Sequence, residues 1–266
     1  MKKKYTLALL LALVAAACNT ESSSDPNYAN SDGSSDGSSD GGQGGSMARF
    51  TLAGDYLYTV ENDQMKVFSL ADPSRPYHMP SKDISLQAGA ETIFTIDTLL
   101  FIGSQNGMYI YNITDRERPR FISLTIHVKS CDPVVSDGSH AYVTLNSNNF
   151  WCGRSTNVLQ VYDVRNTASP LLVAEDQMEG PRGLGLSGTK LFVCDKVGVR
   201  VYDVTNPARP EWVDDLDHIR EIASIQAYDV IPLATTLLVI GEDGFYQLDH
   251  SGERLSLVSK IEVKRE

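Results

Sequence analysis

From Ala48 to the end of the chain, short apolar runs alternate with turns rich in Gly, Asn and Asp. Apolar runs of about four to eight residues bounded by turn residues predict strands, whereas helices need longer runs with a 3.6-residue period. Only the stretch from Trp212 to Ala223 has a weak helical period. The pattern therefore predicts an all-β domain.

One motif recurs five times in this region and defines five repeats. Each copy has an apolar, an aromatic, a variable and a second apolar residue, and in four copies a proline follows eight residues after the aromatic. From first to fifth, the copies are Val67–Leu70 with Pro76, Ile110–Ile113 with Pro119, Val161–Val164 with Pro170, Val201–Val204 with Pro210, and Phe245–Leu248, where Arg254 stands in the proline position. Repeats of about 40 to 50 residues with four short strands each are typical of a β-propeller. We expect a propeller of five four-stranded blades, with six blades as the alternative.

The fourth repeat divides into four predicted strands separated by turns. They are Gly183–Leu186, Lys190–Cys194, Val199–Val204 and Glu211–Asp214. The first is almost continuously apolar, as expected for a strand covered on both faces. We therefore place it innermost in its blade.

The third strand and the following turn of this repeat resemble a known family. Gly198 leads the segment Val199-Arg-Val-Tyr-Asp-Val-Thr-Asn-Pro-Ala-Arg-Pro210, which is similar to the repeat unit of the LVIVD-repeat family. The likeness covers all five repeats, and the region from Cys131 to Ile261 resembles lipoproteins of Bacteroidetes-type bacteria. Arg182 stands where that group has a histidine, so no role of that histidine carries over. The resemblance implies a propeller in the cell envelope and implies no defined reaction.

The amino terminus has the pattern of a secretory signal. Three lysines precede the apolar run Tyr5–Ala17, which is too short to span about 30 Å of hydrocarbon comfortably. The sequence Ala15-Ala-Ala-Cys18 resembles a bacterial lipobox, which implies that Cys18 becomes the lipid-bearing first residue of the mature protein. The alternative is an ordinary signal peptide cut after Ala17, with Cys18 unmodified.

The residues after Cys18 bear on location and on domain organisation. Asn19 rather than Asp follows the cysteine, and by resemblance to the sorting of envelope lipoproteins this favours the outer membrane, on either face. Residues up to Ser46 are rich in Gly, Ser and Asp and lack the apolar side chains that offset conformational entropy. We therefore predict a signal peptide at 1–17, a lipidated cysteine and disordered linker at 18–46, and the propeller at 47–266.

Charge narrows the possible partners. Asp and Glu number 34 against 23 Lys and Arg, so the net charge is −11. This excess of acid argues against a nucleic-acid-binding protein, which needs clustered basic residues, and against electrostatic docking on anionic lipid. The expected membrane contact is therefore the lipid on Cys18.

The four cysteines are too few for a disulfide scaffold. Cys131 and Cys152 both lie in the third repeat, and a bond between them would stabilise the fold by about 3 kcal/mol in the chain-entropy model. The oxidising envelope favours this disulfide, and two reduced, buried cysteines are the alternative. Cys194 ends an apolar predicted strand, so we expect it in the core.

A central channel is the first candidate site. The predicted innermost strands begin with charged residues that are expected to meet at one mouth of the channel, namely Arg49, Glu91, Asp132, Arg182 and Asp229. Three acids and two arginines can bind a small polar ligand or a cation. They can equally pair with each other and close the channel.

Loop aromatics are the second candidate site. Phe150 and Trp151 lie in the longest loop of the third repeat, where they can contact a partner or fold back over the propeller. The five histidines are scattered, and catalytic, zinc-binding and nucleotide-binding motifs are missing from the sequence. We therefore expect no cofactor, no metal and no enzymatic activity.

The leading expectation is a non-enzymatic, lipid-anchored protein that binds an envelope protein or a glycan. One alternative is a glycan-active enzyme that uses Asp132 and Asp229 at the channel mouth. Another is a glycan-binding module without activity. Propellers include enzymes and binding proteins alike, so the expected fold does not choose between them.

Overall fold

The computed structural model describes residues 45–127, 133–147, 156–196, 198–220, 222 and 225–263. All of them lie within the compact unit Ser39–Glu266. Among these residues, no helix has the length and apolar character needed to cross a membrane. Six residues singled out by the sequence lie outside the described ranges: Cys18, Cys131, Asp132, Phe150, Trp151 and Cys152.

The described chain is built almost wholly of strands. In chain order they are β1 (Phe50–Ala53), β2 (Tyr56–Ser69), β3 (Tyr77–His78), β4 (Ile84–Ile96), β5 (Leu99–Ser104), β6 (Gly107–Asn112), β7 (Arg120–Ile126), β8 (Val134–Ser136), β9 (His140–Asn146), β10 (Asn157–Asp163), β11 (Leu171–Gln177), β12 (Leu184–Ser187), β13 (Lys190–Cys194), β14 (Val199–Asp203), β15 (Glu211–Asp214), β16 (Ala227–Pro232), β17 (Thr236–Gly241), β18 (Gly244–Asp249) and β19 (Ser256–Glu262). A 3-10 turn, η1 (Pro80–Lys82), precedes β4.

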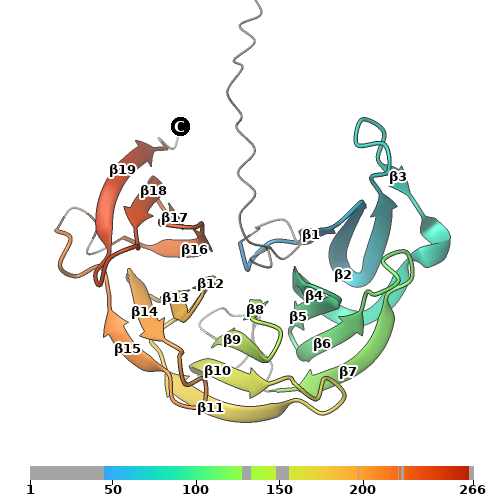
Figure 1. Cartoon of the computed structure of the whole chain (residues 1–266), viewed down its shortest axis with the longest axis horizontal. Helices are drawn as coiled ribbons and strands as arrows, with labels where there is room; N and C mark the ends of the chain where they lie inside the picture. The colour runs from blue at the N-terminus through green and yellow to red at the C-terminus, as the bar shows by residue number, and fades with distance from the viewer. Residues whose placement is uncertain are drawn as a thin grey trace, which may run out of the picture. The chain divides into compact units, whose positions relative to one another are not determined.

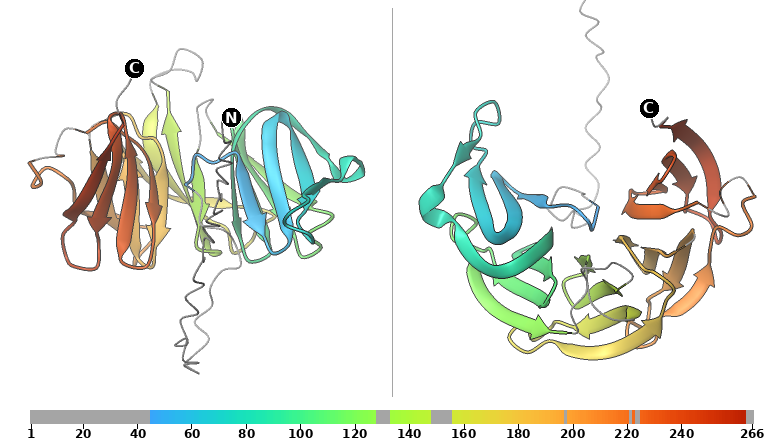
Figure 2. Two further views of the ribbon diagram at one scale, coloured as in Figure 1. Left: turned by 90° about the horizontal axis from the view of Figure 1, so that it is seen from above. Right: turned by 180° about the vertical axis from the view of Figure 1, so that it is seen from behind.

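The strands form four antiparallel sheets, shown from three directions in Figures 1 and 2. Three sheets have four strands each, in the simple orders β8 to β11, β12 to β15 and β16 to β19. The first sheet has seven strands, in the order β1-β2-β4-β5-β6-β7, with β3 paired to β2. Neighbouring sheets meet through their inner strands, since β8 contacts β4 and β12, and β12 contacts β16. This confirms the all-β expectation and the four-stranded unit.

The seven-stranded sheet combines the first two repeats because two of its strands continue through a turn or bend. β2 turns back at Asn62, which has a φ of 44°, a conformation that asparagine tolerates better than most residues. Leu70 N then donates to Asp55 O at 2.7 Å across the two ends of this strand. β4 pairs with β2 in its first half and with β5 in its second half, so one strand belongs to both repeats.

One backbone hydrogen bond recurs in all five repeats. It joins the residue after the third strand to the residue before the second strand, and the donors are Leu70, Ile113, Val164, Val204 and His250, with acceptors Asp55, Thr98, Ser139, Thr189 and Thr235. Donor and acceptor are fifteen residues apart in every repeat except the third, where the long loop separates them further. The repeats seen in the sequence therefore share one local structure.

Apolar side chains fill four clusters, each made by residues of two successive repeats. The two-residue period of a strand produces this arrangement, because alternate side chains point to opposite faces. In β13, Leu191 and Val193 join the cluster shared with the third repeat, whereas Phe192 and Cys194 join the cluster shared with the fifth. The repeats between the first and the fifth are thus buried on both faces, which explains their continuous apolar runs.

Most local predictions for the fourth repeat are confirmed. β12 to β15 match the four predicted strands to within one residue, and Cys194 is fully buried in the core. The weak helical period from Trp212 onward does not correspond to a helix there, because Trp212 and Val213 belong to β15. The predicted linker also ends too late, because Gly45 and Ser46 are part of the fold.

Candidate functional site

The segment just before β1 occupies the place where the inner strands come together. Ser46 Oγ donates to Asp229 Oδ1 of β16 at 3.1 Å and accepts from Leu184 N of β12 at 2.7 Å. Met47 N donates to the other carboxylate oxygen of Asp229 at 3.2 Å. Ala48 O accepts from Ile93 N of β4 at 3.0 Å. Three consecutive residues of one segment thereby contact three sheets.

Glycines make room for the Asp229 carboxylate. A Cβ on Gly45 or on Gly183 would collide with a carboxylate oxygen of Asp229. A Cβ on Gly185 would lie 2.5 Å from Pro232 Cδ. The Gly183-Leu-Gly185 sequence therefore has a packing role, since it lets β12 approach β16 closely.

Asp229 is buried, and the protein itself supplies its hydrogen bonds. Burial raises its pKa to about 6, although hydrogen bonds from Met47, Val230 and Ser46 act in the opposite direction. Its carboxylate accepts from Ser46, Met47 and its own neighbour Val230. This arrangement differs from the expectation of an acid exposed at a channel mouth, because the amino-terminal segment covers it.

The structure brings together two of the four described residues predicted at the channel mouth. Arg182 donates from Nη1 to Ala227 O at 3.3 Å and lies over the Tyr228 ring, and both Arg182 and Asp229 act electrostatically on Cys194. Burial is the main reason that the pKa of the Cys194 thiol is raised. Cys194 is therefore an inert core residue rather than a reactive thiol.

The other two described residues have different neighbours. Glu91 accepts from Gln105 Nε2 at 2.9 Å. Arg49 is exposed and interacts electrostatically with Glu61. A ring of five charged groups at one mouth stays a prediction, because Asp132 lies outside the described residues.

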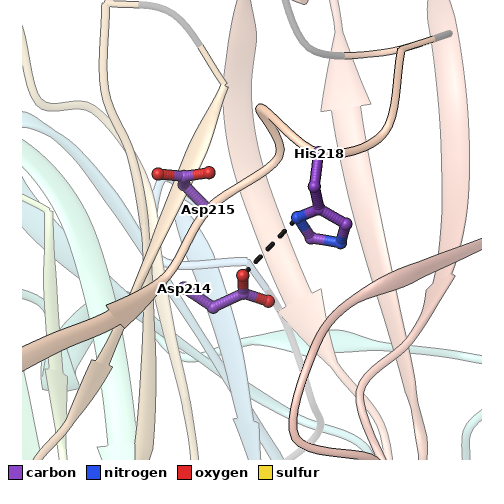
Figure 3. A group of neighbouring side chains, drawn as sticks. All are labelled: Asp214, Asp215 and His218. Carbon is purple, nitrogen blue, oxygen red and sulfur yellow. Dashed lines mark ion pairs between the residues drawn. The ribbon is translucent and has the colours of Figure 1, made fainter.

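A second group of chemically active side chains lies at the end of β15 and on the loop that follows it, drawn in Figure 3. Asp214, Asp215 and His218 each bring one possible ligand atom within 4.8 Å of the others. His218 Nδ1 lies 3.5 Å from Asp214 Oδ1, and His218 Nε2 lies 2.8 Å from Leu255 O. Asp214 is buried, Asp215 is half-buried and His218 is exposed.

The fifth repeat holds Asp214 in place. Leu255 N donates to Asp214 Oδ2 at 2.8 Å, and Arg254 Nε approaches Asp214 Oδ1 at 3.3 Å. A cavity of about 470 Å³ opens beside this group and is lined by Trp212, Val213, Asp214, Asp215, Glu253 and Arg254. The Trp212 ring itself lies under the Arg200 guanidinium.

Sequence reasoning missed this group. The sequence Asp214-Asp215-Leu-Asp-His218 places possible metal ligands close together along the chain, but it matches no familiar metal-binding motif. The partners of this segment come from the fifth repeat, at Arg254 and Leu255, and no local pattern connects them to it. Arg254 also marks the one repeat without the proline.

Comparisons with known proteins support the fold alone. No family model matches the chain, and no curated protein sequence matches it significantly. Among solved structures, the chain is similar to a functionally unknown protein from Desulfotomaculum acetoxidans, with 11% identity and a TM-score of 0.60 over 85% of this chain and 70% of that one. It is also similar to the periplasmic gluconolactonase of Pseudomonas aeruginosa, with 13% identity and a TM-score of 0.57 over 79% of this chain and 68% of that one.

BamB from Moraxella catarrhalis is a further structural relative, with 10% identity and a TM-score of 0.54 over 80% of this chain. The chain spans 62% of the length of BamB, and 58% of the chain of the Nup159 amino-terminal domain. The structural similarity supports a β-propeller fold, and at identities this low it says nothing about function.

Proposed function

We propose that this protein is a lipid-anchored, non-enzymatic binding protein of the bacterial envelope, built as a β-propeller of five blades. The observation that carries the proposal is the contact of Ser46 and Met47 with Asp229. The chain's own amino-terminal segment donates hydrogen bonds to both carboxylate oxygens of Asp229, the buried acid at the inner strands. A ligand or substrate would have to displace this segment to reach Asp229, so binding is better served by the outer surface.

The anchor and the linker fit this role. Lipidation of Cys18 would hold the protein at the outer membrane, and the Gly-, Ser- and Asp-rich linker would let the propeller reach a partner at a distance on the order of 30 Å. The acidic net charge of −11 favours a partner with a basic or neutral surface over anionic lipid or nucleic acid.

The blade count follows from the repeats. Five copies of one hydrogen bond and four apolar clusters between successive repeats support five blades. In a closed ring the outer faces of the first and fifth repeats would also meet. Those faces carry exposed apolar side chains, including Phe50 on β1 and Phe245 and Ile261 on β18 and β19.

A glycan ligand is the second candidate. A cavity of about 410 Å³ beside β4, β6 and β7 is lined by Tyr109, Tyr111 and Phe121 among other residues. Aromatic faces can stack on sugar rings, and Phe121 is more than half exposed. A glycan would therefore bind here or at the predicted loop aromatics Phe150 and Trp151.

Two measurements test the proposal. Metabolic labelling with a clickable fatty acid should mark the wild-type protein and not the Cys18→Ala variant, and an unlabelled wild type would refute the anchor. Crosslinking in intact cells should then enrich one envelope protein or glycan with the wild type, compared with an unrelated lipoprotein as control. Turnover of a polysaccharide by the wild type, abolished in Asp132→Asn, would replace the proposal by the enzymatic alternative.

A further inference from the structure

We infer that Asp214, Asp215 and His218 form a binding site for one divalent transition-metal ion, of which zinc is the representative. The inference does not depend on the proposed function. It rests on the ligand geometry, on the hydrogen bond that orients the histidine, and on the balance of charge around the cavity.

The histidine presents the correct nitrogen. Leu255 O can only accept a hydrogen bond, so His218 Nε2, at 2.8 Å from it, must carry the proton. In the neutral ring Nδ1 then has a lone pair, and Nδ1 faces Asp214 Oδ1 at 3.5 Å. Metal-binding histidines commonly donate their other N–H to a backbone carbonyl in this way, which fixes the ring.

A lone pair facing a carboxylate oxygen is unfavourable without a positive charge between them. Two groups can supply it, either a proton on Nδ1 or a metal ion. Zinc–nitrogen and zinc–oxygen bonds of about 2.0 to 2.2 Å put neighbouring ligand atoms of a tetrahedral site about 3.3 Å apart. The separation between Nδ1 and Oδ1 already meets that requirement. Asp215 is half-buried, and its Oδ1 accepts from Asp217 N at 2.9 Å, so its second carboxylate oxygen is the one that would reach the metal.

The net charge of the cavity lining also favours a bound cation. Asp214, Asp215 and Glu253 contribute three carboxylates, and Arg254 contributes one guanidinium. The lining therefore carries an excess of two negative charges, which a divalent ion balances. One imidazole and two carboxylates suit zinc better than calcium or magnesium, which prefer oxygen ligands alone.

The cavity leaves room for the remaining ligand positions. Its volume of about 470 Å³ exceeds what one or two metal-bound waters require. Arg254 opposes metal binding, because its Nε lies 3.3 Å from Asp214 Oδ1. The Arg254 side chain is 63% exposed, so it can turn away into solvent when a metal takes its place.

The test is a titration of the full chain, first stripped of metal with a chelator, with zinc chloride by isothermal titration calorimetry. The wild type should bind one zinc ion that the Asp215→Asn and His218→Gln variants bind at least about tenfold more weakly, the loss typical even for an outer partner of a ligand. Arg254→Gln should bind more tightly than the wild type, because a competing cation is removed. His140→Gln is the matched control, since His140 also lies near an aspartate, Asp137, but belongs to no group of three possible metal ligands among the described residues.

Two readouts keep the outcome decisive. Thermal unfolding of the metal-free variants identifies any loss of fold. Asp215→Asn should have none, because Asp215 is only half-buried and an asparagine can still accept from Asp217 N. Nitrogen NMR should show zinc changing the His218 Nδ1 resonance while Nε2 keeps its proton. Equal zinc affinity of the wild type, Asp215→Asn and His218→Gln would overturn the inference, as would a protonated Nδ1 that zinc leaves unchanged.

Discussion

Ser46 Oγ lies 3.1 Å from Asp229 Oδ1, although the two residues are 183 positions apart in the chain. This hydrogen bond fastens the amino-terminal segment to the first strand of the last repeat. The same oxygen of Ser46 accepts from Leu184 N, so one hydroxyl joins β12 and β16. A residue that the composition assigns to a linker therefore connects the inner strands.

Removal of this hydroxyl should weaken the fold. Ser46→Ala leaves Leu184 N buried without its acceptor and takes one donor from Asp229, at a cost of about 1 to 3 kcal/mol in the free energy of unfolding. Urea denaturation measures the loss, and Ser256→Ala on exposed β19 is the control that should stay near the wild type. Equal stability of both variants would mean that the Ser46 contact contributes nothing.

Asp229 should make stability depend on pH. Its folded-state pKa of about 6 lies above the ordinary value of 3.8, so the folded state binds the proton more tightly than the unfolded chain. The resulting stability is complete below about pH 4 and is lost as the pH rises to about 6, a change of about 3 kcal/mol. Relative to Asp229→Asn, the wild type should therefore become less stable between pH 4 and pH 7.

Denaturation midpoints of both proteins at intervals of one pH unit measure this difference. Asp203→Asn is the control, because hydrogen bonds from Thr205 lower the pKa of Asp203. Relative to Asp203→Asn, the wild type should therefore become more stable, not less, as the pH rises. A constant difference between the wild type and Asp229→Asn across the range would contradict the prediction.

Gly183 should tolerate no side chain. A methyl group there would collide with the Asp229 carboxylate, and relieving the collision would displace β12 or the amino-terminal segment. We expect Gly183→Ala to cost about 1 to 3 kcal/mol, as overpacked cores do. Gly252→Ala is the matched control, because the nearest atom to its added methyl group would be 3.7 Å away. Thermal unfolding distinguishes the two, and a stable Gly183→Ala would show that the sheets can separate freely.

Ring closure by five blades can be tested at the outer face of the last repeat. Ile261 on β19 and Leu171 on β11 are 66% and 64% exposed. If both stay exposed in solution, an aspartate at either position should lower the free energy of unfolding only slightly. If the first and fifth repeats meet in solution, Ile261→Asp buries a charge and should cost at least about 1 to 3 kcal/mol more than Leu171→Asp. Equal stability of the two variants would speak against a closed five-bladed ring.

The predicted disulfide between Cys131 and Cys152 is open to direct measurement. Mass spectrometry of a non-reduced digest should find the two peptides joined, and reduction should lower the free energy of unfolding by about 3 kcal/mol. Alkylation of both cysteines without prior reduction would show the thiols to be free. Cys194 should resist alkylation in either case, because it is fully buried.

The repeats and their strands could be read from the sequence because strand formation depends on local patterns. Alternating or continuous apolar runs, glycine turns and a proline at a constant spacing set the four strands of the fourth repeat to within one residue. The burial of Cys194 followed for the same reason, since it ends an apolar strand covered on both faces. These features require only neighbours along the chain.

The sites depended on contacts between distant segments, which no local pattern encodes. Ser46 became part of the fold only because β12 and β16 converge on it, and Asp229 changed from a possible ligand group into a buried anchor by the same contacts. The sequence predicts only a strand at Gly183 and Gly185, whereas the structure shows that these glycines let two sheets approach. Likewise, His218 acquires its orientation from Leu255 of the following repeat. Local sequence determined which strands form, and the packing of successive sheets decided which side chains meet.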